Sequence, residues 1–213
     1  MSDHISAVKK VVPVSRETAE RLEAFVALLR KWQPAQNLVA NDEMGDIWRR
    51  HVADSAQLPS LFPDARTWMD LGSGGGFPGM ILAIIGGRTV HLVESNARKC
   101  AFLRAATRET GANAVVHEGR AETILKNWET PVDRVSARAL APLDELLDLA
   151  EPLMARGVPA AFMKGGGFRG ELVKARGKWE FDVVEHPSRT NPDAAILDIS
   201  GLRRGANQVK NVP

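Results

Sequence analysis

The segment 68–79 constrains the fold more than any other part of the chain. An apolar run ends at Asp70, and glycines then stand at nearly every second position up to Gly79. This order predicts a strand, a sharp turn and the start of a helix. Glycines allow a ligand to approach the backbone closely, and the unpaired amides of a first helical turn attract its polar groups. We therefore predict a loop that cradles a nucleotide.

The composition is that of an ordinary globular protein. Of the 213 residues, 44% are apolar and 25% are charged, which is enough to build a core. No apolar run approaches the roughly 20 residues of a membrane-spanning helix, and residues 1–10 lack the apolar segment of a secretory signal. We expect a cytoplasmic protein without a membrane partner, with a monomer as the default. The net charge of +2 neither requires nor excludes nucleic acid.

Cysteine and histidine usage excludes several kinds of site. The single Cys100 rules out an internal disulfide and a cysteine-cluster metal site. The five histidines are scattered without metal-ligand spacing, so we expect no metal. Cys100 lies in an apolar helical stretch and reads as a buried small residue. That position argues against cytosine C5 methylation, which needs a reactive thiolate.

Two hydrophobic patterns divide the chain. Before residue 65, apolar residues at helical spacing predict helices at about 15–33 and 42–57, within an N-terminal helical cap (15–64). Between residues 65 and 202, short apolar runs alternate with helical segments, which is typical of a mostly parallel sheet with helices on both faces. The flanking segments 1–14 and 203–213 are expected to be a flexible tail and a polar tail.

The expected elements define an α/β fold. Helices are predicted at 78–85, 97–110, 122–127 and 143–155, and strands at 67–71, 89–94, 114–117, 132–136, 159–163, 181–185 and 195–199. No helical pattern separates the last two strands. We therefore expect a seven-stranded sheet whose last two strands form an antiparallel edge.

The glycine loop fits two cofactor fingerprints. Gly74, Gly76 and Gly79 match the dinucleotide pattern. Asp70, Gly72, Gly74 and Gly76 match the first motif of Rossmann-like methyltransferases, which bind S-adenosylmethionine. Asp70 favours the second pattern, because a carboxylate attracts the amino group of the methionine moiety and repels a pyrophosphate. The alternatives are an NAD-binding protein and a glycine turn without a ligand.

Further candidate site residues follow the other predicted strands. Glu94 ends the second strand, where an acid can bind the ribose hydroxyls. Ala121 and Glu122 follow the third strand, beside the expected adenine. Arg138 and Lys164 follow the fourth and fifth strands and are expected to face the same crevice. Solvated surface charges are the alternative interpretation of these residues.

Several segments together resemble the 16S rRNA guanine-N7 methyltransferase family, also called the glucose-inhibited division protein B family. The most specific match is Arg-His-Val-Ala-Asp-Ser at 50–55, although Arg50 and Asp54 could also form a surface pair. Other matches are 32–38, 70–79, 99–103, 119–122, 136–139 and 164–165. At 191–197 the chain departs from the family's Arg-His-aliphatic ending, which leaves any role of that edge open.

The resemblance implies a Rossmann-like fold and N7-methylation of guanine 527 in 16S rRNA. The substrate would be the rRNA, the small ribosomal subunit or an assembly intermediate. The residues implied to contact S-adenosylmethionine are Gly72, Phe77, Ala121, Glu122 and Arg138. A methyltransferase acting on a protein or a small molecule is the alternative.

The proposed chemistry needs no general base, because guanine N7 carries a free lone pair. Arg138 is expected to position the cofactor. RNA contacts are expected from the basic or polar side chains near the crevice: Arg49, Arg50, His51, Lys164 and Arg169.

Overall fold

The computed structural model describes residues 3–205 and contains a seven-stranded sheet in the order β3-β2-β1-β4-β5-β7-β6. The strands are β1 (Thr67–Leu71), β2 (Thr89–Glu94), β3 (Ala114–Glu118), β4 (Arg134–Arg138), β5 (Ala160–Lys164), β6 (Trp179–Pro187) and β7 (Ala195–Arg204). Neighbouring strands from β3 to β5 are parallel, and β7 pairs antiparallel with both β5 and β6. The predicted sheet with its antiparallel edge is confirmed.

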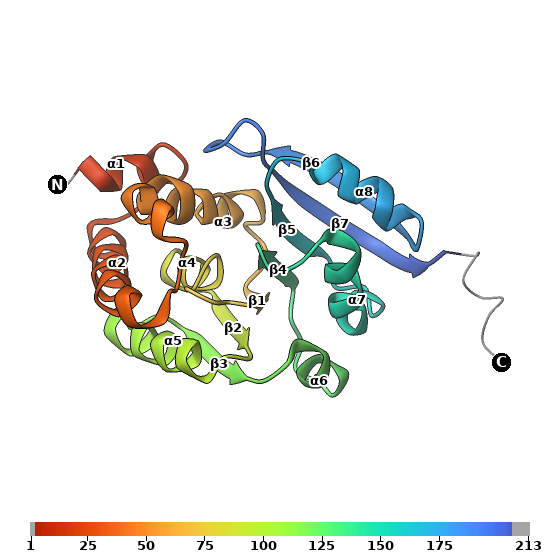
Figure 1. Cartoon of the computed structure of the whole chain (residues 1–213), viewed down its shortest axis with the longest axis horizontal. Helices are drawn as coiled ribbons and strands as arrows, with labels where there is room; N and C mark the ends of the chain where they lie inside the picture. The colour runs from red at the N-terminus through yellow and green to blue at the C-terminus, as the bar shows by residue number, and fades with distance from the viewer. Residues whose placement is uncertain (1–2, 206–213) are drawn as a thin grey trace.

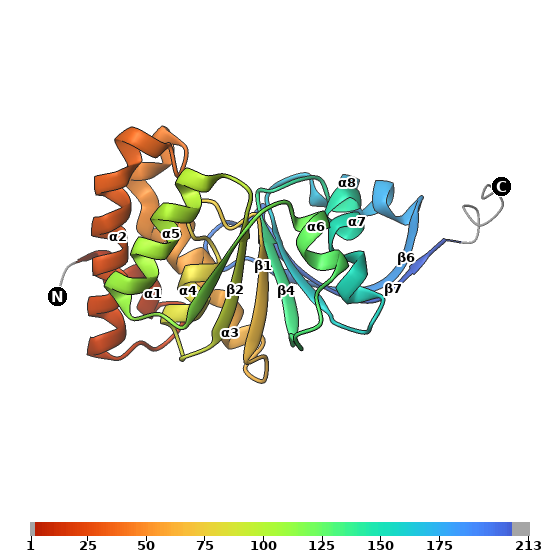
Figure 2. The same ribbon diagram turned by 90° about the horizontal axis from the view of Figure 1, so that it is seen from below.

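Helices cover both faces of this sheet (Figures 1 and 2). Helices α4 (Gly79–Ile84) and α5 (Ala97–Thr110) lie on one face, where α2 (Arg16–Gln36) packs over them. The other face carries α6 (Ala121–Lys126), α7 (Leu143–Met154) and α8 (Phe168–Arg176). Each face of the sheet has its own hydrophobic core, and successive strand residues point into opposite cores. Trp68 of β1 lies in the first core and Met69 in the second.

The helices before β1 belong to the first core. Phe25 of α2 contacts Phe77 and Phe102 at ring-centroid distances of 5.5 and 6.1 Å. Figure 1 shows the whole N-terminal region wrapped along this side of the sheet. The cap predicted for 15–64 therefore shares apolar packing with the helices that follow the glycine loop.

The expectation of a flexible tail over 1–14 is wrong for its described part. Residues Asp3–Lys9 form α1, and Ile5, Val8, Val11 and Val12 are buried in the first core. Burial of these apolar side chains orders the segment, although their pattern is too short to stand out in the sequence. At the other end, β7 continues to Arg204, and 206–213 lie outside the described residues.

The helix predicted at 42–57 is divided in the structure. A 3₁₀ helix, η1 (Asn41–Asp46), is followed by a π-helical segment, η2 (Trp48–Ala53), and by α3 (Gln57–Leu61). Pro59, expected in a loop, lies in the first turn of α3, where its missing amide costs nothing. Single-turn π segments inside helices frequently mark functional sites.

Two further differences concern the second half of the chain. Strand β4 begins two residues later than predicted, at Arg134, and so ends at Arg138 itself. Helix α8 was not predicted, although Phe168, Leu172 and Ala175 are buried at helical spacing. Gly170 and the charged residues around it hide this pattern in the sequence. Within residues 3–205, none of the helices has the length and apolarity needed to cross a membrane.

Candidate functional site

The carboxyl ends of the parallel strands meet at one edge of the sheet. Strand β1 pairs with β2 on one side and with β4 on the other, so the strand order reverses there. In open α/β sheets, ligands bind in the crevice at this point. Two cavities open along this edge, one near the ends of β1–β3 and one near the ends of β4 and β5.

The first cavity, of about 290 Å³, contains most of the residues predicted to bind a cofactor. Its lining includes Gly72, Gly74, Glu94, Ala121 and Glu122. These residues come from three successive strand ends, as the sequence predicted. We call it the donor cavity.

Glu94 is held tightly at the rim of the donor cavity. Its Oε2 accepts a hydrogen bond from the amide of Gly74 (2.9 Å), and its Oε1 accepts one from the amide of Asn96 (2.8 Å). Glu94 is buried, with only 8% of the residue exposed. The carboxylate is thus oriented by backbone from two different loops.

Asp70 is not at the surface of the donor cavity, contrary to its predicted contact with the cofactor amino group. Its Oδ1 accepts a hydrogen bond from the Ser136 hydroxyl (2.7 Å), and the residue is fully buried. Burial raises the pKa of Asp70 to about 6, against the opposing effects of Ser136, Ser73 and the nearby Gly79 amide. That amide lies close to the carboxylate, yet Oδ2 accepts no hydrogen bond among the described residues. Asp70 therefore supports the loop from beneath.

The remaining loop residues also face inward. The side chain of Phe77 packs against His51, with ring centroids 4.9 Å apart. A Cβ placed on Gly76 would meet Met80 at 2.8 Å. In this structure, Gly76 and Phe77 do not line the donor cavity; the Phe77 ring packs between loop and core, and Gly76 leaves room for Met80.

Leu140 covers the first glycine of the loop. A Cβ placed on Gly72 would lie 2.5 Å from Leu140 Cδ1, and Leu140 also lines the donor cavity. Its neighbour Ala139 adopts a left-handed φ of 51°, an uncommon conformation for a residue with a side chain. Since Ala139 lines both cavities, this turn separates them.

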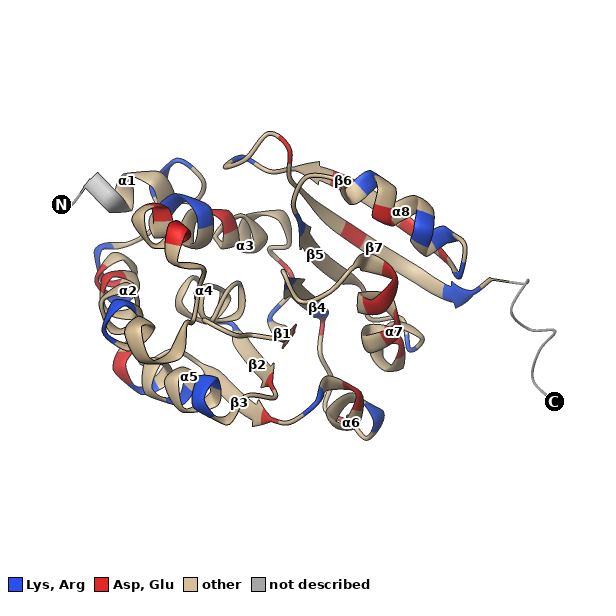
Figure 3. Ribbon diagram, in the orientation of Figure 1, with Lys and Arg blue, Asp and Glu red and all other residues tan. Residues whose placement is uncertain are grey.

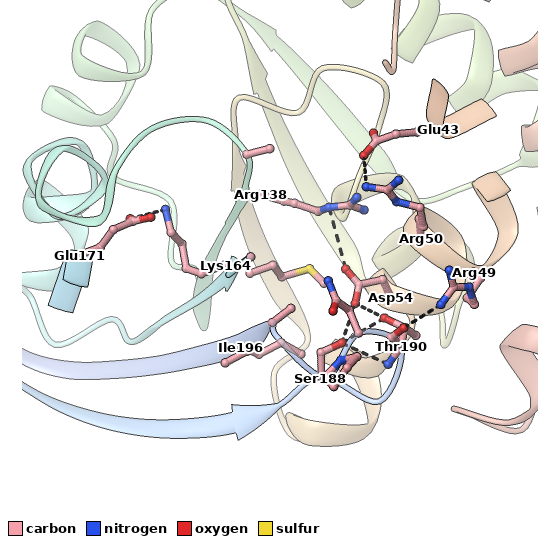
Figure 4. Close-up of a pocket in the computed structure, with 17 residues that line it drawn as sticks. Glu43, Arg49, Arg50, Asp54, Arg138, Lys164, Glu171, Ser188, Thr190 and Ile196 are labelled. Atoms are coloured by element: carbon pink, nitrogen blue, oxygen red, sulfur yellow. Dashed lines mark hydrogen bonds and ion pairs between the residues drawn. The ribbon is translucent and has the colours of Figure 1, made fainter. Parts of the chain in front are cut away.

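The second cavity, of about 450 Å³, lies between the π-helical segment, the end of β4 and the β6–β7 loop. Figure 4 shows Arg138, Asp54, Arg50 and Glu43 gathered on one side and Lys164 with Glu171 on the other. Polar and charged groups thus meet in a recess whose volume lies in the usual range of ligand pockets. We call it the acceptor cavity.

Arg138 projects from the end of β4 into the acceptor cavity. Its Nε lies 4.0 Å from Asp54 Oδ2, and its Nη1 is buried without a hydrogen-bond partner among the described residues. Burial lowers the pKa of Arg138, while Asp54 and Glu43 oppose that shift. A buried guanidinium with an unused donor is suited to bind an anionic or carbonyl oxygen.

The structure separates the five predicted RNA contacts into three kinds. Arg49 and Arg50 line the acceptor cavity and are about half exposed, paired with Asp46 and Glu43 respectively. Arg169 is exposed, lies outside the acceptor cavity and pairs with Glu185. Arg49 and Arg169 can exchange an exposed partner for a phosphate at little cost, whereas the partner of Arg50 is half-buried and also binds His51.

His51 does not agree with its predicted role in RNA contact, because it is a core residue. Only 5% of it is exposed, and its Nε2 lies 2.9 Å from Glu43 Oε2. That carboxylate would favour protonation, yet burial, Arg138 and Arg50 outweigh it and lower the pKa of His51 to about 3. The neutral ring therefore donates from Nε2 to Glu43.

Lys164 also differs from its predicted role. Its Nζ lies 2.6 Å from Glu171 Oε2 and donates to the carbonyl of Ala141 (2.9 Å). The same Glu171 oxygen accepts from the amide of Leu143 (2.7 Å). Lys164 and Glu171 therefore anchor the segment 139–143, which carries the turn between the two cavities.

Asp54 lines the acceptor cavity, although sequence reasoning did not name it as a site residue. Its possible surface pair with Arg50 does not form, since Arg50 binds Glu43 and Asp54 faces Arg138. The sequence did contain a signal for Asp54, because this residue belongs to the specific Arg-His-Val-Ala-Asp-Ser match at 50–55. The hydroxyls of Ser188 and Thr190, which bind Asp54, had no such signal.

Comparisons with known proteins identify the family of the chain. The family model described as "GidB: rRNA small subunit methyltransferase G" matches residues 18–195. The ribosomal RNA small subunit methyltransferase G of Parvibaculum lavamentivorans is 50% identical over 194 residues, which cover 89% of this chain and 85% of that protein. The protein of the same name from Rhodospirillum centenum is 51% identical over 197 residues, with 92% and 90% covered.

Solved structures show the same fold at much lower identity. An O-methyltransferase from Bacillus cereus, in complex with SAH, matches with a TM-score of 0.55 and 15% identity, covering 92% of this chain and 96% of that one. At this identity the likeness concerns the fold alone, and the fold is that of a methyltransferase.

Proposed function

The chain belongs to the rRNA small subunit methyltransferase G family, and we propose that it transfers a methyl group from S-adenosylmethionine to N7 of a guanine in 16S rRNA. The guanine implied by the resemblance is number 527. The observation that carries this proposal is the pair of cavities, which meet at Ala139 on the carboxyl edge of the sheet. A group-transfer enzyme needs such adjoining sites for donor and acceptor.

The residues that line the donor cavity are suited to bind S-adenosylmethionine. Glu94 offers two carboxylate oxygens that could turn from backbone amides to ribose hydroxyls. Gly72 and Gly74 present bare backbone at positive φ, and Ala121 and Glu122 lie where an adenine would bind. When bound, S-adenosylmethionine supplies an electrophilic methyl group on a positively charged sulfur.

Arg138 is proposed to position the cofactor carboxylate. Arg138 lines the acceptor cavity and not the donor cavity, but it stands next to Ala139, which lines both, and its unpartnered Nη1 supports a reach toward the donor. A guanidinium directly at N7 would oppose the positive charge that develops on the purine, so the cofactor side is the better place for it. The residue would hold the donor without exchanging a proton.

The reaction forms a bond from N7 to carbon and breaks the bond from carbon to sulfur. The N7 lone pair becomes the new bond, and the electron pair of the broken bond neutralises the sulfonium. Since no proton leaves, catalysis depends on aligning the reacting atoms, and orientation alone can contribute about 7–11 kcal/mol.

The target guanine must enter the acceptor cavity unstacked from its neighbours. Arg49 and Arg50 stand at the wall of that cavity, on the π-helical segment. Elsewhere basic and acidic residues are mixed on α2, α5, α6 and α8, whereas α7 carries acids alone (Figure 3). We propose that the RNA backbone follows the arginines beside the acceptor cavity.

Two experiments test this function. Deleting the gene and mapping modified bases should remove one N7-methylguanine from 16S rRNA; persistence of every such base refutes the RNA assignment. Calorimetric titration should show binding of S-adenosylmethionine and not of NAD. Binding of NAD alone would instead support an oxidoreductase.

A further inference from the structure

We propose that Asp54 is the specificity-determining carboxylate of the acceptor cavity, accepting hydrogen bonds from N1–H and the N2 amino group of the guanine to be methylated. This inference rests on the proposed function and names the group that recognises the base. It assigns to the cap a direct part in substrate selection.

One oxygen of Asp54 is fixed by three neighbours. Oδ1 accepts hydrogen bonds from Thr190 Oγ1 (2.6 Å), Ser188 Oγ (3.0 Å) and Gln57 Nε2 (2.9 Å). Gln57 in turn accepts from the amide of Arg189 (2.8 Å). These contacts join the cap to the β6–β7 loop and lock the carboxylate in one orientation.

The other oxygen is directed toward the cavity. Asp54 Oδ2 lies 4.0 Å from Arg138 Nε, which is longer than a hydrogen bond, and the side chain is 16% exposed. In Figure 4, Asp54 and Arg138 point toward each other on one side of the acceptor cavity. A carboxylate held this way has capacity for two further donors.

The other carboxylates on the cavity wall are already engaged. Glu43 binds Arg50 through Oε1 (2.8 Å) and His51 through Oε2 (2.9 Å). Glu171 binds Lys164 and the amide of Leu143. Among the described residues that line this cavity, Asp54 is thus the acid best able to receive a ligand.

Guanine has the complementary chemistry. Its N1–H and N2 amino group are adjacent donors, whereas adenine presents an acceptor at N1 and lacks the N2 amino group. Methylation at N7 also places positive charge on the purine, so a carboxylate on the opposite edge attracts the transition state more than the ground state. Asp54 would therefore both select guanine and favour its reaction.

The test is a double-mutant cycle that combines a substitution in the protein with a substitution in the RNA. Methyl transfer is measured at saturating S-adenosylmethionine. The substrate is an rRNA fragment with either guanine or inosine, which lacks the N2 amino group, at the target position. For the wild-type protein, inosine should lower kcat/KM by about 10- to 100-fold. Asp54→Asn should lower kcat/KM on guanine by at least this factor, and its loss on inosine should be smaller than its loss on guanine, because only the N1–H contact is left to lose there.

Two variants provide controls. Asp46→Asn changes an exposed carboxylate of the neighbouring 3₁₀ helix that binds Arg49, and it should keep the full inosine penalty. Thr190→Val removes one of the three contacts to Oδ1, and since Ser188 and Gln57 still hold the carboxylate, this variant should also keep that penalty. Circular dichroism and thermal melting verify that each variant is folded.

Three outcomes overturn the proposal. Asp54 does not recognise the base if the losses from Asp54→Asn and inosine multiply, if Asp54→Asn keeps wild-type kcat/KM, or if wild-type protein treats inosine as guanine. In each case the wild-type protein still methylates guanine. If the wild-type protein fails on the guanine fragment and on isolated small subunits alike, the proposed function itself is wrong.

Discussion

The carboxylate of Glu94 binds the amide of Gly74 across 2.9 Å, joining the end of the second strand to the glycine loop that follows the first. The second oxygen of Glu94 holds the amide of Asn96. The strand-end acid that we propose to bind the ribose thus holds the glycine loop in place. Under the proposed function, ribose binding would exchange these backbone donors for hydroxyl donors.

Glu94→Gln is expected to weaken S-adenosylmethionine binding at least tenfold, because the amide group replaces one acceptor with a donor. The unfolding free energy should fall by about 1 kcal/mol, the typical value of a hydrogen bond. Calorimetry and urea denaturation measure the two effects. Glu118→Gln, at the end of the adjacent strand and paired with exposed Arg104, is the control that should change neither.

Gly79→Ala should destabilise the protein by about 1–3 kcal/mol through overpacking. A Cβ at this position would meet Leu92 Cδ2 and would lie 2.5 Å from Asp70 Oδ2, which is fully buried. Gly170→Ala is the matched control, since a Cβ there meets nothing within 4 Å. In that helix, alanine should be neutral or stabilising by up to about 1 kcal/mol. Equal effects of the two substitutions in urea denaturation would contradict this assignment.

Lys164→Met should lower the rate of methyl transfer while leaving the salt dependence of RNA binding unchanged. The amine anchors Ala141 and binds Glu171, so its loss should disturb the turn between the cavities. A lysine that contacts phosphate would instead reduce the slope of log K against log salt by about 1. Glu171→Gln should produce a similar rate loss, and the double variant little more, because the two residues act as a unit. A reduced salt slope for Lys164→Met would restore the RNA-contact interpretation.

Acidification should destabilise the fold through His51. Its pKa is about 3 in the folded protein and 6.5 when unperturbed, so between these values the unfolded chain binds the additional proton. The contribution of His51 to stability is therefore complete above about pH 6.5 and decreases as the pH falls toward 3. Within that window the loss approaches about 1.4 kcal/mol per pH unit.

Urea denaturation between pH 7.5 and 4.5 checks this effect by comparison with His51→Gln. The variant keeps a donor for Glu43 but does not titrate, so its stability should vary less with pH than that of the wild-type protein. Asp70 acts in the opposite direction: with its pKa raised to about 6, the folded state binds the proton first, and stability rises as the pH falls through 6. Parallel curves for the two proteins would show that His51 does not titrate as described.

The sequence by itself determined the sheet and the donor cavity. Alternating apolar runs and helical patterns encode strands and helices locally, and parallel strands necessarily present their carboxyl ends at one edge. Glu94, Gly72, Gly74, Ala121 and Glu122 therefore line one cavity, as predicted from their positions after strands. The family resemblance rests on the same short motifs.

Only the tertiary structure decided which polar side chains are buried and what they bind. His91 and His117, 26 residues apart, are within hydrogen-bond distance (3.0 Å) because adjacent strands pair. Asp70 and His51 look like surface ligands in the sequence but lie in the core. Asp54 meets Ser188 and Thr190 across more than 130 residues of chain. Short-range patterns carry no information about such contacts, since they depend on how the cap and the antiparallel edge pack together at the end of β4.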